Sequence, residues 1–158
     1  AVELTPGAAW RLVNVERTTA PWQLSEVEFH TTSECKGKVN GFPLASSQQA
    51  YHEAAKAFDG ITKTSSSWVA GCVSSGCEPG QWLGLLLDAP HAFQCIKIYQ
   101  ASPNLVGDPS SAVVRVERWG GTDLGWETVR TFGTVKSGRW VDLIILSATA
   151  KFAQKAPS

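Results

Sequence analysis

The sequence predicts an all-β protein, an antiparallel β-sandwich of about eight short strands. Short runs of β-branched, aromatic and aliphatic residues recur along the chain at the spacing of hairpins and longer loops. Glycine, proline, serine and asparagine separate these runs. Almost no stretch carries the hydrophobic period of an amphipathic helix. These three observations favour two packed antiparallel sheets over a helical or α/β architecture.

The expected strands are short and follow one another along most of the chain. They cover residues 10–15, 24–29, 82–88, 93–99, 113–119, 126–132 and 139–146. In the second of these, Glu26 and Glu28 share one face, and such a pair is typical of ordinary solvated surface. Residues 36–49 are rich in Gly, Ser, Gln and Pro and predict an irregular connection. Residues 48–58 are compatible with a single helical turn.

The length of the chain is that of one domain. Its 158 residues are enough to bury most of their apolar surface. Hydrophobic residues make up 43% and charged residues 18%, which indicates a globular protein rather than a disordered or fibrous one. We therefore expect one sandwich domain over residues 1–146, followed by a small polar tail or linker over residues 147–158.

Charge and hydropathy argue against several classes of partner. Fourteen basic and fourteen acidic side chains cancel, and there is no run of Lys or Arg. The chain thus lacks the electrostatic footprint of a nucleic-acid-binding protein and the polybasic segment that docks onto anionic lipid. Residues 141–146 form an apolar run of strand length, and no stretch approaches the length of a transmembrane segment.

Four cysteines bear on the cellular compartment. The residues between Cys72 and Cys77 include two serines and a glycine, which suits a small disulfide ring, and this leaves Cys35 to pair with Cys95. The spacing is not that of a zinc ribbon, and no histidine pair lies nearby. Two disulfides predict an oxidising compartment, hence a secreted, extracellular or lumenal protein. The alternative is four reduced thiols that act as small core residues.

Motifs for catalysis are incomplete. His52 and Glu53 begin like a metalloprotease helix, but Lys56 stands where the second histidine ligand is required. The sequence contains no Gly-x-Ser-x-Gly elbow and no phosphate-binding loop. The three histidines are scattered and favour structural or exposed roles. We therefore expect a protein that is not an enzyme.

Six motifs, in order along the chain, carry a family resemblance. They are residues 57–60 (Ala-Phe-Asp-Gly), 67–68 (Ser-Trp), 81–88 (Gln-Trp-Leu-Gly-Leu-Leu-Leu-Asp), 95–98 (Cys-Ile-Lys-Ile), 114–121 (Val-Arg-Val-Glu-Arg-Trp-Gly-Gly) and 126–129 (Trp-Glu-Thr-Val). The Asp-Gly step makes a sharp turn, because Asp bonds its own backbone and Gly accepts positive φ. In this order the motifs resemble the discoidin, or coagulation factor 5/8 type C, family of galactose-binding-like jelly-roll sandwiches.

The order of the strands departs from that family in one respect. The family's closing strands usually contain an arginine-bearing β-run, a loop with Trp, and a Glu-Leu/Val-x-Phe strand. Here that pattern stands first, as residues 10–13 (Trp-Arg-Leu-Val), Trp22 and residues 25–29 (Ser-Glu-Val-Glu-Phe). The chain therefore resembles a circularly permuted member, a change that sandwiches tolerate when their termini lie close together.

The resemblance implies a structural calcium ion. Its ligands would be Asp59, Thr64 and Glu26, together with backbone carbonyls, because hard cations bind oxygen-rich sites. The loop from Asp59 to Trp68 is about two residues longer than is usual in the family, and Ile61 stands where a polar residue is common. In the alternative interpretation, Asp59 only accepts hydrogen bonds from the amides of its own turn.

The resemblance also places ligand binding in the loops at one end of the sandwich, at residues 44–53, 69–80 and 100–110. The candidate ligand-binding side chains in these loops are Tyr51, His52, Glu78, Asn104 and Asp108. The loops contain no arginine, so the Arg-His-aromatic set of galactose-type sites is not assembled. Four apolar residues could instead reach a lipid surface, namely Phe42, Leu44, Leu105 and Val106. Few Lys or Arg residues accompany them to bind lipid headgroups.

Seven tryptophans are many for this length. Those within strand patterns are expected in the core or at its rims, namely Trp10, Trp82, Trp119 and Trp140. Trp68 is expected to plug one end of the sandwich, as its family counterpart does. Trp22 follows a proline in a loop and is a candidate for an exposed platform, although family likeness favours packing, and Trp126 is ambiguous.

These inferences converge on a non-catalytic extracellular recognition or adhesion module. The leading ligand is carbohydrate, on a glycan or glycoprotein, bound through the loops at one end of the sandwich. The alternative is a protein-interaction subunit of a larger extracellular or lumenal assembly, in which the same loops or a sheet face would dock. The fold class supports both functions.

Overall fold

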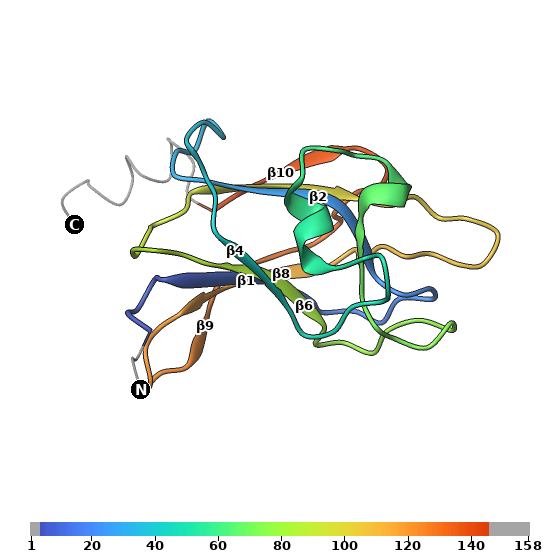
Figure 1. The fold of residues 1–158 in the computed structure, drawn as a ribbon, viewed down its shortest axis with the longest axis horizontal. Coiled ribbons are helices and arrows are strands. Elements are labelled where there is room, and N and C mark those ends of the chain that lie inside the picture. Colours follow the sequence, from blue (N-terminus) through green and yellow to red (C-terminus); the bar gives the residue numbers. More distant parts are fainter. Residues whose placement is uncertain (1–3, 146–158) are drawn as a thin grey trace.

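The computed structural model describes residues 4–145, which form two antiparallel β-sheets packed face to face (Figure 1). The first, here called the β1 sheet, has the strand order β4 (Phe42–Ala45), β6 (Trp82–Leu86), β1 (Ala9–Asn14), β8 (Val114–Trp119) and β9 (Trp126–Phe132). The second, the β2 sheet, has the order β10 (Trp140–Ile144), β7 (Cys95–Gln100), β2 (Gln23–His30) and β3 (Lys38–Val39), with β5 (Trp68–Val69) also paired to β2. The predicted all-β sandwich is confirmed.

The seven predicted strands are all present, and three short ones join them. β3 and β4 lie within residues 36–49, where we expected an irregular connection, and β5 contains Trp68. Pro43 lies in β4, which occupies the edge of its sheet and pairs only with β6, where a missing N–H is tolerated. Helical structure among the described residues is limited to two 3₁₀ turns, η1 (Ala54–Phe58) and η2 (Thr64–Ser66).

The core lies between the two sheets and is closed at one end by two tryptophans. Trp22 and Trp68 are both fully buried and meet edge to face, with ring centroids 5.4 Å apart. Trp68 is buried in the core, as expected for a ring that fills the sandwich. Of the two alternatives for Trp22, packing is confirmed and the exposed platform is wrong, because its ring lies in the core and its Nε1 donates to Gln100 Oε1 at 2.8 Å.

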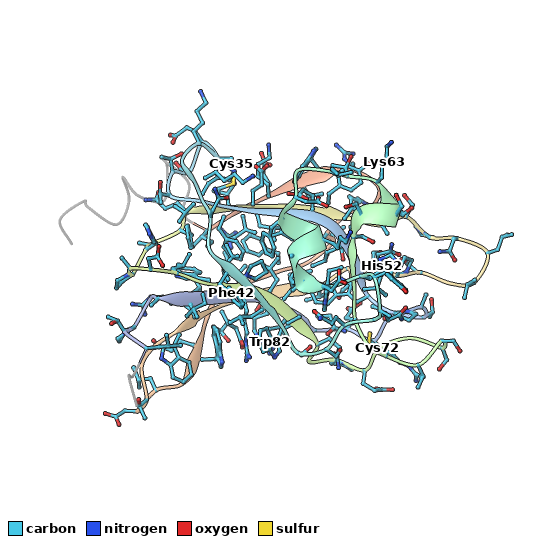
Figure 2. The ribbon with its side chains drawn as sticks, viewed as in Figure 1. Cys35, Phe42, His52, Lys63, Cys72 and Trp82 are labelled. Carbon is cyan, nitrogen blue, oxygen red and sulfur yellow. A yellow bond between two sulfur atoms is a disulfide. The ribbon has the colours of Figure 1, made fainter. Side chains whose placement is uncertain are left out.

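Both predicted disulfides are present (Figure 2). Cys35–Cys95 joins the loop after β2 to the start of β7 across 60 residues of sequence, and the loop-entropy model assigns such a cross-link about 4 kcal/mol of stabilisation. Cys72–Cys77 closes a small loop of sequence separation 5. Gly76 within it has φ of 118°, and a Cβ there would lie 1.8 Å from the Thr18 carbonyl oxygen, so only glycine fits.

The structure corrects the prediction that Glu26 and Glu28 share a solvated strand face. Glu28 lies partly exposed, as expected of a solvated strand face, whereas Glu26 is fully buried. A β-bulge between Leu24 and Glu26 shifts the register of β2, and η1 packs against this strand. The predicted tail at residues 147–158 lies outside the described residues, and within them no helix is long and apolar enough to cross a membrane.

Candidate functional site

A cavity of about 580 Å³ lies where the ends of β2 and β7 meet the loops at one end of the sandwich. β2 contributes Gln23 and Ser25 to its lining, and β7 contributes Tyr99. The connecting segments supply the remaining lining residues, which are His52, Thr62, Thr64, Ser65, Ala101, Ser102, Asn104 and Gly138. Figure 2 shows His52 and Lys63 at this end of the molecule. The volume is that of a site for a small organic ligand.

The lining of this cavity is rich in hydroxyl groups and contains one aromatic ring. The Ser25 Oγ is buried and has no hydrogen-bond partner among the described residues. The Tyr99 hydroxyl donates to the Gly138 carbonyl at 3.2 Å, which fixes the ring at the wall of the cavity. A buried hydroxyl is seldom left without a partner, so Ser25 marks a place where a ligand or water completes the bonding.

His52 and Asn104 offer complementary hydrogen-bonding groups. The His52 Nδ1 lies 2.9 Å from the Ser67 carbonyl oxygen, which requires the proton on Nδ1 and leaves Nε2 as an acceptor. The Asn104 Oδ1 accepts from the Val106 and Gly107 amides at 2.8 and 3.2 Å, so its side-chain amide group remains a donor. An acceptor beside a donor suits a ligand hydroxyl, which can fill both roles.

A second cavity of about 270 Å³ adjoins the first. The two share Gln23, His52 and Asn104, and the second has apolar walls from Pro21, Val69, Val106 and Pro109. The shared polar side chains are thus flanked by a hydroxyl-rich hollow on one side and an apolar hollow on the other. This combination matches a ligand that has both hydroxyl groups and an apolar face.

The other predicted ligand-binding residues lie outside the two cavities. Tyr51 is adjacent to His52 in sequence but 83% exposed at the surface. Glu78 forms an exposed ion pair with Arg17 at 3.5 Å. Asp108 accepts from the backbone and hydroxyl of Ser110 at 2.9 and 2.6 Å and so shapes its own turn. Of the five candidate ligand-binding residues, the fold brings together two, His52 and Asn104.

Sequence reasoning missed three strand residues of the cavity, namely Gln23, Ser25 and Tyr99. On the sequence, Tyr99 is an ordinary outward-facing strand position, and Gln23 precedes the predicted strand of residues 24–29. Ser25 falls on the same predicted face as Val27 and Phe29, which is the core face. Only the pairing of β2 with β7 and the connections beside them make these positions part of a concave site. The signal that could have found them is the polar composition of the start of β2, where Gln and Ser alternate with core residues.

The rim of this end of the molecule carries exposed apolar side chains. Leu105 and Val106 extend from the loop between β7 and β8 and are almost fully exposed, and Val73 is exposed within the small disulfide loop. These positions include two of the four apolar tips expected from the sequence. Exposed apolar residues gathered around a polar cavity are typical of a surface that meets a partner.

A second feature, a pair of neighbouring carboxyl groups, lies where β2 passes under the turn after η1. Glu26 in β2 is fully buried, and neither of its carboxyl oxygens has a hydrogen-bond partner among the described residues. Asp59 is exposed and accepts from the Ile61 amide at 2.9 Å and from the Ser66 hydroxyl. The Gly60 backbone and the Asp59 carboxyl group are close enough to act on Glu26, but neither meets it in good hydrogen-bond geometry, so the bonding of the buried carboxyl group is incomplete.

Burial raises the pKa of Glu26 from 4.5 to about 8. The neighbouring Asp59 raises this pKa as well, whereas the Gly60 backbone and Lys38 act in the opposite direction. At neutral pH the Glu26 carboxyl group therefore holds a proton unless a cation takes its place. Of the three predicted metal ligands, the fold brings Glu26 and Asp59 together.

Thr64 is not brought to this pair by any contact in the structure. It lines the cavity, and its carbonyl oxygen accepts from the Ser67 hydroxyl at 2.6 Å. Among the described residues, one cluster of three potential metal-binding side chains exists, formed by Cys35, Cys95 and Asp142. Two of its members are joined in a disulfide and offer no thiolate, so this cluster does not fit a metal.

The fold and the cavity define an all-β sandwich with a ligand-sized site at one end of its sheets. Comparisons with protein-family models, with curated proteins and with solved structures found no match for the chain.

Proposed function

We propose that the protein is a non-catalytic recognition module that binds carbohydrate in the cavity at the loop end of the sandwich. The observation that carries this proposal is the hydroxyl-lined cavity in which His52 and Asn104 present an acceptor beside a donor. Sugar hydroxyls both donate and accept, and the C–H face of a sugar ring packs on apolar or aromatic groups. Tyr99 on one side and Pro21 on the other supply such groups.

Binding rather than catalysis fits the polar groups of the cavity. His52 is held by a backbone carbonyl, and neither cavity contains a carboxylate to act with it as an acid–base pair. The hydroxyl groups from β2, η2 and the loops are suited to a network of neutral hydrogen bonds. Such a network selects a ligand by its hydroxyl pattern.

The test is a screen of the purified protein on a glycan array, followed by titration of the best ligand with variants. We expect His52→Ala and Asn104→Ala each to weaken binding by about tenfold, the effect of one or two lost hydrogen bonds. Tyr51→Ala is the matched control, because Tyr51 is adjacent in sequence but lies outside both cavities. Absence of binding to every glycan on the array would remove the proposal.

A second candidate function is that of a protein-interaction subunit in a larger assembly. The exposed apolar side chains of Leu105, Val106 and Val73 around the cavity favour it. If this function is the correct one, Leu105→Ser and Val106→Ser will abolish recovery of a partner from the native source, while His52→Ala will not.

We further propose that calcium occupies the Glu26–Asp59 pair and fixes the turn that borders the cavity. Calcium would supply the positive charge that the two neighbouring carboxyl groups lack. The unpaired oxygens of Glu26 support this proposal.

We also propose that the protein is a discoidin-like module and that it is secreted or lumenal. Both disulfides and the absence of a membrane-spanning helix from residues 4–145 are compatible with that location.

A further inference from the structure

The outer face of the β1 sheet carries an aromatic cluster, whereas the strand residues that line the cavity belong to the β2 sheet. Trp82 in β6 and Trp126 in β9 lie with ring centroids 6.2 Å apart, and Trp119 in β8 meets Trp126 edge to face at 5.5 Å. All three rings are partly exposed. The described helices and strands form two sheet layers, with η1 packed on β2, β4 and β5, so none of them covers this face (Figure 1).

An arginine lies within this cluster. The Arg11 guanidinium carbon is 4.1 Å from the centroid of Trp126 and 5.1 Å from that of Trp82, so both tryptophans contact the cation. Gly84 makes room for it, because a Cβ at that position would lie 2.3 Å from the Trp10 carbonyl oxygen and 2.8 Å from the Arg11 Cβ. The cluster is built from four neighbouring strands, β6, β1, β8 and β9, rather than formed by one mobile side chain.

Two guanidinium groups on this face share one carboxylate. The Arg11 Nε donates to Glu117 Oε1 at 2.7 Å, and the Arg115 Nε donates to Glu117 Oε2 at 2.8 Å. Both oxygens of Glu117 are used, and one positive charge remains in excess. Within residues 4–145, the terminal nitrogens of neither arginine have a hydrogen-bond partner. These nitrogens are donors suited to a planar anion.

We propose that this face is a second binding surface, for a polysaccharide chain that bears carboxylate or sulfate groups. The excess positive charge and the free donors match the anionic groups, and the partly exposed indoles match the apolar faces of sugar rings. The ring centroids of Trp82 and Trp126 lie 6.2 Å apart and those of Trp126 and Trp119 lie 5.5 Å apart, so the three indoles together offer more surface than one sugar ring covers. An extended chain therefore fits this face better than a monosaccharide does.

Other partners fit these observations less well. A nucleic acid requires a tract of cations along its phosphates, and this face has one excess charge on a chain of zero net charge. A protein interface also favours Trp and Arg, but it is depleted of acidic residues, and on this face Glu117 pairs with both arginines.

The experiment is calorimetric titration of the whole chain with three oligosaccharides of equal length. They are an oligogalacturonate (carboxylate), a heparin fragment (sulfate and carboxylate) and a neutral malto-oligosaccharide. We expect one or both anionic chains to bind, with affinity that falls as salt rises, and the neutral chain to bind at least tenfold more weakly. The two anionic probes show which group is recognised.

Arg115→Gln is the decisive variant, because Arg115 is the more exposed of the two arginines and its loss leaves the Arg11–Glu117 pair in place. We expect it to weaken anionic binding on the order of tenfold. Lys97→Gln is the matched control. It removes one cation that also lies over a tryptophan, Trp140, but on the β2 sheet. It should leave the affinity unchanged.

Several results would overturn the inference. They are no saturable binding of either anionic chain, equal losses in Arg115→Gln and Lys97→Gln, or equal affinity for an oligothymidylate of the same charge. Self-association of the chain that Arg115→Gln abolishes would show instead that the face contacts a second copy. Glycan binding in the cavity is tested separately, with the ligands found on the array. A negative result for the face of the β1 sheet therefore does not affect the proposal for the cavity, and the reverse also holds.

Discussion

Two carboxyl groups, one on each sheet, are buried on the sides that face away from the core, and they have opposite surroundings. Glu117 in β8 has a guanidinium nitrogen within 2.8 Å of each oxygen. Glu26 in β2 has no hydrogen-bond partner among the described residues, and burial raises its pKa to about 8. A buried carboxylate is stable only when charge and hydrogen bonds compensate its lost hydration. Glu117 is therefore complete as folded, whereas Glu26 requires a proton or a cation.

Removal of the Glu117 charge should have the largest effect on stability. Glu117→Gln leaves Arg11, which is 17% exposed, and Arg115 without their counter-ion. Loss of one partner of a buried ion pair costs about 3–5 kcal/mol, and we expect the lower end because Arg115 is one-third exposed. Urea unfolding measures the loss. Glu28→Gln is the control on the other sheet. The Gln amide keeps an oxygen that can accept from His30 Nε2, which lies 2.9 Å from Glu28, and the second partner, Lys38, is exposed at 3.8 Å, so this change should cost less than about 1 kcal/mol.

Calcium should stabilise the protein through Glu26. At pH 8 and a calcium concentration a hundred times the Kd, binding to the folded state adds about 2.7 kcal/mol. Glu26→Gln should abolish this gain and fold at least as well as the parent chain in chelator, because the amide carries no buried charge. Thermal melting with calcium and with chelator provides the measurement. A calcium response that survives in the variant would place the ion elsewhere.

The pH dependence of stability in chelator should be about 1.4 kcal/mol per pH unit, the limit for one proton. Between 4.5, the ordinary pKa, and about 8, the folded pKa, the folded state holds the Glu26 proton and the unfolded state does not. Rising pH in this window therefore favours unfolding, and the stabilisation present below pH 4.5 is lost as pH passes through 8. Urea midpoints at pH 5, 6, 7 and 8 test this. An equal slope in Glu26→Gln would contradict the assignment.

The sequence was sufficient for features that depend on local pattern. The β-rich runs at residues 93–99 and 113–119 identified strands, which the structure has at Cys95–Gln100 and Val114–Trp119. The small loop between Cys72 and Cys77 identified one disulfide and, by elimination, the other. The short strand β4 was missed because Gly and Pro around it are typical of loops, and its pairing with β6 is a long-range contact.

The candidate site depended on features that a sequence shows poorly. Trp22 follows a proline in a connection, and nothing local shows that Trp68, far away in sequence, covers it. Glu26 was predicted on a solvated face because it alternates regularly with core residues, as Glu28 does. The bulge that precedes Glu26 in β2 and the turn that covers it have no recognisable pattern in the sequence of this strand. His52 and Asn104 were predicted because the family resemblance places ligand binding in the loops at one end of the sandwich, and both line the cavity there.

The smallest predicted effect distinguishes the two interpretations of Asp59. Asp59→Ala removes the hydrogen bonds to the Ile61 amide and the Ser66 hydroxyl, which should cost about 1 kcal/mol in chelator. If Asp59 also binds calcium, the loss will be larger in calcium, because the variant forfeits the ligand-linked stabilisation as well. Thermal melting in both conditions measures the difference. Equal losses would mean that Asp59 only shapes its turn, and Glu26 would then be a buried acid that the fold keeps protonated.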